Sequence, residues 1–224
     1  MTNSADVFKK IVNQRRSVRA YLPEPIPQQT LESIFNAAQG APSNCNTQPW
    51  QVAVASGATI ERLRTKIPAA FSSGQWTMDF PYDGKYSGVY KDRQYASAAA
   101  LYSAMGISRE DKVARNTQFM NNYTFFGAPH VAFLFLPESF GLREAADLGM
   151  YAQNLMLSIT AHGLASCPQT ALSFNCDVVR EELEIDADQK LLFGLSFGYE
   201  DLSDPVNGSR TERAGLDEVV RFYK

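Results

Sequence analysis

The chain has 224 residues, of which 45% are hydrophobic and 20% are charged, and its formal net charge at pH 7 is −3. The high apolar content and the small net charge exclude an intrinsically disordered chain. A dedicated nucleic-acid-binding protein is also disfavoured, because the composition provides no overall positive field. The length corresponds to about one and a half average domains, so composition alone leaves one or two domains open.

Two amphipathic helices are predicted near the N-terminus. The first carries the apolar residues of Val7–Val12 on one face and is capped by Ser4 or Asp6. The second covers Leu31–Ala38 and ends at Gly40.

The rest of the chain alternates predicted helices with a few strands. Helices are expected over Ile60–Ile67, Ser108–Tyr123 and Leu142–His162, and strands over Gln51–Ala55, His130–Leu136 and Lys190–Gly198. The strand HVAFLFL is apolar throughout, which is typical of a strand buried on both faces. A few strands between helices predict the α+β class. We find no second domain, so residues 1–224 are expected to form a single domain.

Residues 68–95 do not follow this pattern. They hold many aromatic residues among glycines and prolines, without a helical or strand period. A long irregular segment inside a compact domain is often a lid or a binding loop, and Trp76, Tyr86 and Tyr90 are candidates to roof a substrate pocket. A surface excursion packed by its own aromatic side chains is an equally good alternative.

The chain contains three cysteines, none in a Cys-x-x-Cys spacing, and two histidines. These residues are too few and too scattered for a disulfide framework or a zinc site, so no metal is expected. The first ten residues lack the apolar core of a signal peptide. The longest apolar run, Val131–Leu136, is far too short to span a membrane. We therefore expect a cytoplasmic protein without a membrane partner.

Two basic segments could converge on one anion. Arg15, Arg16 and Arg19 surround Ser17 after the first helix, and guanidinium groups with a hydroxyl suit a phosphate dianion. The segment Asn207–Arg213 offers a second polar and basic loop near the C-terminus. Arginine clusters are more often solvated surface, so an anion site requires that the two segments meet in space.

Two further polar clusters lie next to predicted strands. Ala41–Trp50 is rich in proline, serine and asparagine, whose side chains offer donors and acceptors to a polyol or a heterocycle edge. Gly163–Ala171 leaves the long helix and turns at Pro168, where backbone N–H groups could face a planar ring. An ordinary loop remains the alternative for the first cluster. Cys45 is not expected to be a nucleophile, since no histidine lies close to it in sequence and no helix N-terminus follows. Cys167 precedes a proline in a segment expected to be buried, where a cysteine packs as a small hydrophobic residue.

Several catalytic motifs are missing from the sequence. It contains no Gly-x-Gly-x-x-Gly after a strand, no Walker motif, no His-Glu-x-x-His and no Gly-x-Ser-x-Gly. A Rossmann dinucleotide site and hydrolytic machinery are therefore unsupported. His130 and His162 are expected to be structural.

Five motifs, taken in order, resemble those of the FMN-dependent nitroreductase family. They are RRSVR at Arg15–Arg19, APSNCNTQPW at Ala41–Trp50, FFGAPHVAF at Phe125–Phe133, GLASCPQ at Gly163–Gln169, and FGYED followed by NGSRTER near the C-terminus. Their order and spacing match over nearly the whole chain, apart from about residues 56–117. The aromatic middle of the chain resembles the nitrobenzoate or nitroaromatic reductase subgroup.

The resemblance implies a nitroreductase-like α+β fold with a central, mostly antiparallel sheet flanked by helices. It also implies an intertwined homodimer with FMN at the interface, about one per chain. The resemblance assigns the FMN phosphate to Arg15, Ser17 and Arg210, with Arg16 nearby and Arg19 near the ribityl chain or the pyrimidine edge. This chain departs from many relatives at Gly208, where they carry a basic residue.

The resemblance assigns the flavin ring to three other segments. Pro42, Ser43, Asn44 and Asn46 are expected to reach the flavin of the other protomer. Pro168, Gln169, Thr170 and Ala171 are expected along one face of the ring, with a backbone N–H near Thr170 and Ala171 directed at N5. Asn121 or Asn122 is expected at the pyrimidine edge.

The implied activity is a ping-pong reduction in which NADH or NADPH reduces the flavin at N5 and an electron-poor acceptor reoxidises it. The acceptor would be a nitroaromatic compound, a quinone or a similar small molecule, and no side chain would act as acid, base or nucleophile. Two alternatives stay open. The chain could be a non-catalytic protein that binds or stores FMN, or a flavoenzyme of the same fold with other chemistry, such as dehalogenation, heterocycle oxidation or flavin destruction.

Overall fold

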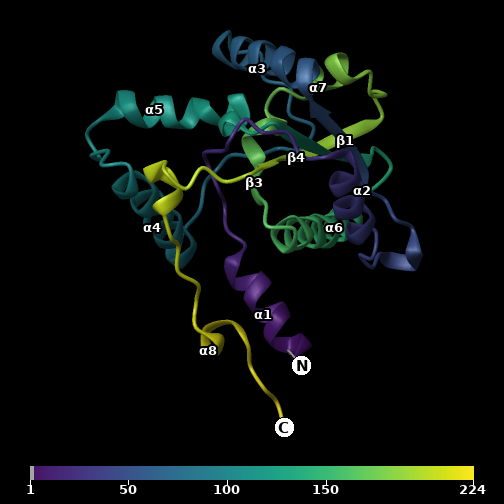
Figure 1. The fold of residues 1–224 in the computed structure, drawn as a ribbon, viewed down its shortest axis with the longest axis vertical. Coiled ribbons are helices and arrows are strands. Elements are labelled where there is room, and N and C mark those ends of the chain that lie inside the picture. The colour runs from purple at the N-terminus through teal and green to yellow at the C-terminus, as the bar shows by residue number, and fades with distance from the viewer. Residues whose placement is uncertain (1–2) are drawn as a thin grey trace.

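A computed structural model describes residues 3–224 and contains a four-stranded sheet with helices on both faces (Figure 1). The strands are β1 (Gln51–Ser56), β2 (His130–Pro137), β3 (Ala165–Gln169) and β4 (Gln189–Gly198). Their spatial order is β1-β2-β4-β3, and each neighbouring pair is antiparallel. The predicted α+β class with a mostly antiparallel sheet is confirmed.

The central strand β2 separates two hydrophobic clusters. Four helices contribute to these clusters: α2 (Gln28–Ala38), α3 (Gly57–Ser72), α6 (Leu142–Ala161) and α7 (Cys176–Leu183). Phe133 belongs to the cluster that contains residues of α3 and α7, whereas Leu134 belongs to the one that contains residues of α2 and α6. Because successive strand residues point to opposite faces, a strand between two clusters is apolar at every position.

The predicted bounds of β1, β2, β4 and α6 agree with the structure to within one residue at each end. These elements carry the strongest apolar patterns in the sequence. No helix within residues 3–224 is long and apolar enough to cross a lipid bilayer.

The N-terminal helix α1 (Ser4–Gln14) and the short C-terminal helix α8 (Leu216–Val219) extend from the same end of the body (Figure 1). The prediction for the α1 cap was wrong, because the Asn3 side chain accepts the hydrogen bond from the backbone N–H of Ala5. None of the α1 residues is buried, and its Phe8 is 60% exposed. The apolar face of α1 is therefore largely uncovered by the described residues, although the helix contacts α6.

The prediction of an irregular segment over residues 68–95 was largely wrong. Helix α3 continues through Pro68 to Ser72, and a long helix α4 (Gly88–Ala104) begins near the other end of the segment. Only residues 73–87 between them are irregular. Helix α4 escaped prediction because it buries none of its residues and so has no apolar stripe.

Helix α5 (Lys112–Met120) begins and ends inside the predicted range of Ser108–Tyr123. Its cap is Asp111, whose side chain accepts a hydrogen bond from the Ala114 N–H at 2.9 Å, so the helix begins later than the predicted start at Ser108. The helix gives way to a 3-10 turn over Asn121–Gly127, where two consecutive phenylalanines have left-handed backbone angles. Such angles are incompatible with a continued α-helix.

Gly194 in β4 permits a close approach of the 3-10 turn Thr170–Ser173. A Cβ atom at Gly194 would lie 2.5 Å from Cδ1 of Leu172, which is fully buried. The turn that follows β3 therefore lies directly on the sheet. This contact fixes the backbone of Thr170 and Ala171, which the sequence assigns to the cofactor.

Candidate functional site

A basic cavity of about 890 Å³ lies where α1 ends, β3 begins and the C-terminal segment passes α6. Five arginines line it, and they come from both basic segments of the sequence: Arg15, Arg16, Arg19, Arg210 and Arg213. Ser17 also lines the cavity, and Glu200 is the one acidic residue among the described residues that do so. The two segments that could converge on one anion therefore do meet in space.

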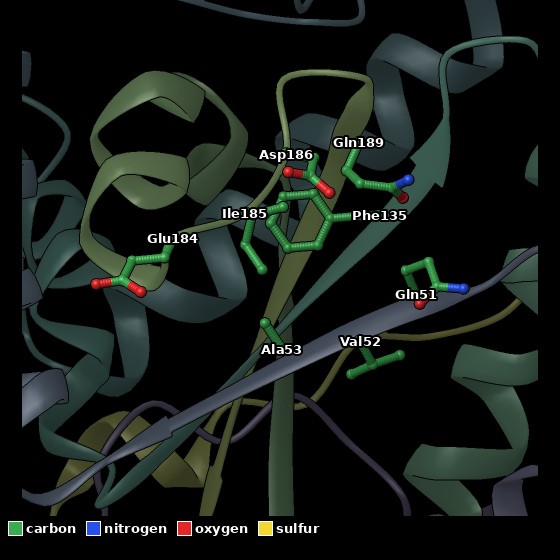
Figure 2. A pocket seen from close by; sticks show the side chains of 8 residues that line it. All are labelled: Gln51, Val52, Ala53, Phe135, Glu184, Ile185, Asp186 and Gln189. Carbon is green, nitrogen blue, oxygen red and sulfur yellow. The ribbon is translucent and has the colours of Figure 1, made fainter.

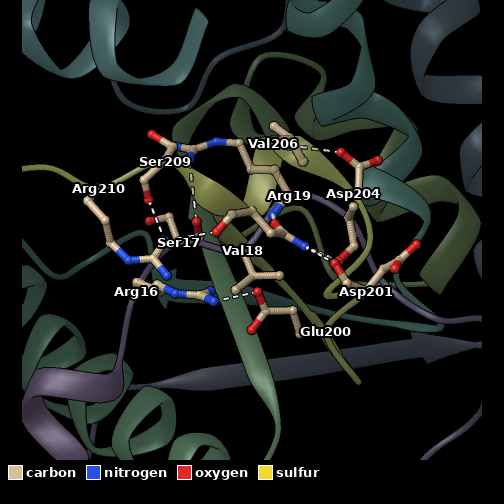
Figure 3. A network of polar contacts seen from close by, with 12 residues as sticks. Arg16, Ser17, Val18, Arg19, Glu200, Asp201, Asp204, Val206, Ser209 and Arg210 are labelled. Atoms are coloured by element: carbon tan, nitrogen blue, oxygen red, sulfur yellow. Dashed lines mark hydrogen bonds and ion pairs between the residues drawn. The ribbon is translucent and has the colours of Figure 1, made fainter. Parts of the chain in front are cut away.

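Most of this positive charge has no acidic partner. Arg16 forms an ion pair with Glu200, which Figure 3 shows beside the other arginines. Burial and the nearby guanidinium of Arg213 lower the pKa of Arg15. Two guanidinium groups that repel one another at a half-buried position favour a bound anion, which would offset the repulsion.

The arginine side chains are oriented by backbone carbonyl groups. The Arg210 guanidinium donates to the carbonyls of Asn207 and Ser209, both at 2.8 Å, and the Arg19 guanidinium donates to the Ser17 carbonyl at 3.4 Å. Ser17 in turn forms an isolated parallel bridge with Ser166 of β3. The cavity wall is thus attached to the sheet.

The buried thiol of Cys167 lies beneath this wall. Burial raises the pKa of the thiol, while the nearby Arg19, Ser17 and Arg15 oppose that effect. A protonated and 2% exposed thiol is not a nucleophile, as the sequence predicts.

The segment Pro168–Ala171 crosses from β3 into the turn that lies on β4. Gln169 is buried, and its amide accepts from the Ser196 hydroxyl and donates to the carbonyl of Asn122 at 3.0 Å. Its side chain is therefore committed within the chain. Pro168 and Thr170 stay exposed and form the outer surface of this segment.

Gln169 joins this segment to the turn that carries Asn121 and Asn122. Its amide also lies 3.2 Å from Oδ1 of Asn122. Asn121 donates to Gln118 at 3.1 Å, and Asn122 donates to the carbonyl of Phe119 at 2.8 Å. Hydrogen bonds thus join two segments that are distant in sequence into one surface.

The loop with Pro42, Ser43, Asn44 and Asn46 lies elsewhere on the chain. The Asn44 N–H donates to the buried carboxylate of Asp147 in α6 at 3.0 Å. Three residues of this loop have left-handed backbone angles, namely Cys45, Asn46 and Gln48. None of the described residues that line the basic cavity belongs to this loop.

The candidate roof residues occupy different positions. Trp76 stacks on Phe71 at 5.3 Å and on Phe174 at 6.2 Å, although it is 56% exposed. Tyr86 precedes α4, and Tyr90 lies in its first turn. Both tyrosines are exposed as well.

Some cavity residues were not predicted from the sequence. Arg213 belongs to the NGSRTER motif, but only Arg210 of that motif was selected. Gln153 lines the cavity from α6, where nothing in the helical pattern distinguishes it. Ser97 of α4, Ser209 and Thr211 complete the polar lining.

A second cavity of about 250 Å³ lies at the β1 edge of the sheet (Figure 2). Strands β1, β2 and β4 line it together with the loop after α7, which contributes Glu184 and Asp186. None of the described residues around it was a candidate site residue. The basic cavity is therefore the candidate site.

Comparison with known proteins places the chain in a family. Residues 12–199 match the model of the nitroreductase family. The chain is 46% identical to nitroreductase NfnB of Mycolicibacterium smegmatis, over 98% of this chain and 94% of that protein. It is 33% identical to a 4-nitrobenzoate reductase of Pseudomonas putida, over 97% of this chain and 96% of that protein.

The fold agrees with solved structures of similar proteins. The FMN-dependent nitroreductase NfnB from Mycobacterium smegmatis, in complex with NADPH, has a TM-score of 0.96 with 45% identity and covers 99% of this chain and 100% of its own. The FMN and NADPH-dependent NfnB from sphigopyxis sp. strain HMH has a TM-score of 0.93 with 37% identity, over 97% of this chain and 99% of its own. The chain belongs to the nitroreductase family.

Proposed function

We propose that this protein is an FMN-dependent oxidoreductase that uses NADPH or NADH to reduce nitroaromatic, quinone or similar electron-poor compounds. The observation that carries this proposal is the basic cavity, where five arginines and a serine hydroxyl surround a single acidic side chain. Two similar proteins support the same cofactors, since NfnB of Mycobacterium smegmatis is FMN-dependent and forms a complex with NADPH, and NfnB from sphigopyxis is FMN and NADPH-dependent.

The donor set of the cavity fits the phosphate group of FMN. A phosphate monoester carries a charge of about −1.5 to −2 at pH 7 and has three strong acceptor oxygens. Arg15, Ser17 and Arg210 would hold it, and Arg213 adds a cation that repels Arg15 until an anion is bound. Arg16 is neutralised by Glu200, so we assign it to the wall of the site and place Arg19 toward the ribityl chain or the pyrimidine edge.

The remaining proposed cofactor contacts come from segments other than the two that carry the arginines. Pro168, Thr170 and Ala171 would face the isoalloxazine ring, with the backbone of Thr170 and Ala171 near N5. Gln169 would support this segment from its buried side, because its side-chain amide already forms hydrogen bonds with Ser196 and Asn122. Asn121 or Asn122 would contact the pyrimidine edge.

FMN, when bound, supplies the hydride chemistry by accepting a hydride from the reduced nicotinamide and giving it to the acceptor in a ping-pong sequence. The residues of this chain bind and orient the two substrates. The Arg19 guanidinium would stabilise negative charge on the pyrimidine edge. Exposed aromatic side chains, with Trp76 first and Tyr86 and Tyr90 beside it, would stack on a planar acceptor.

A second copy of the chain would complete the site. The described part of the chain leaves 13263 Å² of surface exposed, compared with about 10,000 Å² expected for a compact chain of this mass. The largely exposed apolar face of α1 and the extended C-terminal segment account for part of the excess. In such a homodimer, Pro42, Ser43, Asn44 and Asn46 would contact the flavin of the partner.

We also infer a single domain over residues 1–224 and a cytoplasmic location. The inference of a single domain rests on the one sheet that lies between the two hydrophobic clusters. The second rests on the free cysteines Cys45, Cys167 and Cys176, which suit a reducing compartment.

The double variant Arg15→Ala with Arg210→Ala tests the proposal. We expect the wild-type protein to carry about one FMN per chain and to oxidise NADPH with 4-nitrobenzoate as acceptor. Because each hydrogen bond to a charged group is worth about 1.5–3 kcal/mol, the Kd for FMN should rise at least about a hundredfold in the double variant. Arg109→Ala with Arg143→Ala is the control, since both residues are exposed and the change in net charge is the same.

Each result separates the candidate functions. A wild-type protein that binds no FMN overturns the proposal. FMN binding without oxidation of NADPH or NADH, with either a nitroaromatic or a quinone acceptor, supports a storage protein instead. An unchanged Kd for FMN in the double variant would show that the FMN phosphate does not bind in this cavity.

A further inference from the structure

We propose that Asn207 is a positioning residue that holds the two arginine-bearing segments at one phosphate site. The segments are Arg15–Arg19 after α1 and Ser209–Arg213 near the C-terminus, and this inference rests on the proposed function. Asn207 itself contacts neither the cavity nor, by this account, the cofactor.

The side-chain amide of Asn207 connects the first segment to the loop before the second. Its Oδ1 accepts the backbone N–H of Arg19 at 2.8 Å, and its Nδ2 donates to the carbonyls of Ala20 and Asp201, both at 2.9 Å. Asn207 is only 6% exposed, so these bonds are shielded from water. The amide therefore fixes the backbone on both sides of Arg19.

The backbone of Asn207 orients the second segment. Asn207 lies in the 3-10 turn Pro205–Gly208, which is capped by the Asp204 side chain through the Val206 N–H at 2.9 Å. The Asn207 carbonyl accepts a hydrogen bond from the Arg210 guanidinium at 2.8 Å. Figure 3 shows Arg19 and Arg210 together with Asp204, Val206 and Ser209 in this network of polar contacts. One residue thus sets Arg19 through its side chain and Arg210 through its carbonyl.

Other contacts between these parts of the chain, including the Arg16–Glu200 ion pair, lie farther from the second segment. Asp201 N–H donates to the Ala20 carbonyl at 3.1 Å, and Leu22 N–H donates to the Tyr199 carbonyl at 2.9 Å. Both bonds continue the edge of the sheet beyond β4. They hold the start of the loop in place, while Asn207 holds the end that leads into Ser209–Arg213.

An asparagine suits this position because it offers one acceptor and two donors in a fixed plane. An alanine would leave the Arg19 N–H and the Asp201 carbonyl without partners at a part-buried position, while the Ala20 carbonyl would keep only the bond from the Asp201 N–H. An aspartate would keep the acceptor for Arg19 but would direct a carboxylate oxygen at the carbonyls of Ala20 and Asp201. Both substitutions should loosen the two segments relative to one another.

The test compares FMN with riboflavin, which lacks the phosphate. Binding of each flavin to the apoprotein is measured by the change in flavin fluorescence for the wild type, Asn207→Ala and Asn207→Asp. We expect the Kd for FMN to rise at least about tenfold in Asn207→Ala, because Arg210 and the segment that carries Arg15 and Ser17 lose their alignment at the phosphate. The Kd for riboflavin should rise by a clearly smaller factor, because riboflavin lacks the phosphate and can lose only what Arg19 gives to the ribityl chain or the pyrimidine edge.

Ser203→Ala is the matched control in the same loop. Ser203 is exposed and its hydroxyl bonds only Asp201, so both flavins should bind this variant as they bind the wild type. A double variant of Asn207→Ala with Arg210→Ala adds a second readout. Its loss of FMN affinity should be smaller than the sum of the two single losses, because Asn207 acts partly through Arg210.

The outcomes are distinct. Equal weakening of FMN and riboflavin, or no weakening of FMN, overturns the role of Asn207. If Asn207→Ala does not fold, Asn207→Asp decides the question, because it retains the bond to the Arg19 N–H. The change in its Kd for FMN is then compared with the change in its Kd for riboflavin. A wild-type protein that binds neither flavin contradicts the proposed function rather than this assignment.

Discussion

His130 is held as a neutral imidazole at the start of β2. Its Nε2 accepts a hydrogen bond from the backbone N–H of Ile26 at 2.9 Å, so the ring proton resides on Nδ1. The ring lies nearly parallel to Phe197 at 5.3 Å and is only 3% exposed. Burial therefore lowers the pKa of His130 below the usual 6.5.

This lowered pKa predicts a loss of stability in mild acid. Below pH about 6.5 the unfolded chain binds a proton at His130 that the folded chain does not, so the free energy of unfolding falls as the pH decreases. The loss continues until the pH reaches the lowered pKa of the folded state. Urea unfolding at pH 7.5, 6.5 and 5.5 measures it.

His130→Gln should reduce this pH dependence, because the amide oxygen can accept from Ile26 and does not titrate. His162→Gln is the control, since that histidine lies on the surface at the end of α6. If the free energy of unfolding depends on pH equally in the wild type and in His130→Gln, His130 is not the group that causes the loss of stability.

Individual site residues were predictable only where a motif carried them. Arg15, Ser17 and Arg210 were predicted from motifs at the two ends of the sequence, and they line one cavity. Gln153 was not predicted, because a single polar residue on a helix does not indicate which other segment of the chain lies next to it. Asn207 was inside a recognised motif, but its hydrogen bonds depend on the path of a segment more than a hundred residues away.

At the scale of elements, the short strap of residues 73–82 explains how an exposed tryptophan is held. The Thr77 N–H donates to the Phe174 carbonyl at 2.9 Å. The nearly buried carboxylate of Asp79 accepts from the Leu191 N–H at 2.7 Å and from the Arg180 guanidinium at 2.6 Å. Trp76 therefore lies on a rigid support, which suits a surface that stacks on a planar ring.

The substitution Asp79→Asn tests this support. The amide oxygen can still accept one of these bonds, but the charge that compensates Arg180 is lost, and removal of one partner of a buried ion pair costs about 3–5 kcal/mol. We expect a lower free energy of unfolding and a looser Trp76. Since Trp50 is the other tryptophan of the chain, a Trp50→Phe background isolates the Trp76 emission, which should become less anisotropic.

Asp83→Asn serves as the control for the strap. Its carboxylate is exposed and accepts from the nearby Lys85 N–H at 3.0 Å, so stability and emission should match the wild type. If Asp79→Asn behaves like this control, the strap is not what holds Trp76.

Elements were predictable in proportion to how much apolar surface they bury. Strands β2 and β4 and helix α6 form the core and were located closely. Helix α4 buries no residue, and its alanines and tyrosines surround the axis, so periodicity gave no sign of it. Helix α3 runs through Pro68, where the sequence favours an end.

At the scale of the whole molecule, both ends of the chain carry exposed apolar residues. On α1 they include Val7 and Phe8, and in the C-terminal segment Leu216, Phe222 and Tyr223 are 64%, 77% and 87% exposed. The excess surface is about 3,000 Å² per chain relative to a compact protein. Burial of that excess on each of two chains would give an interface in the range of obligate dimers, about 2,000–5,000 Å² or more.

A charge placed on this surface should therefore break the proposed dimer. We expect the wild-type protein to have twice the mass of a 24.9 kDa chain in light scattering, and Phe8→Asp and Phe222→Asp to shift it toward the monomer. Leu202→Asp is the control, because that leucine is 83% exposed in the loop after β4 and lies on neither end segment. The monomeric variants should also lose FMN, since the loop at Pro42–Asn46 would no longer reach the partner's flavin. A wild-type protein that stays monomeric at every concentration, yet holds FMN as tightly as expected, would show that one chain completes the site alone.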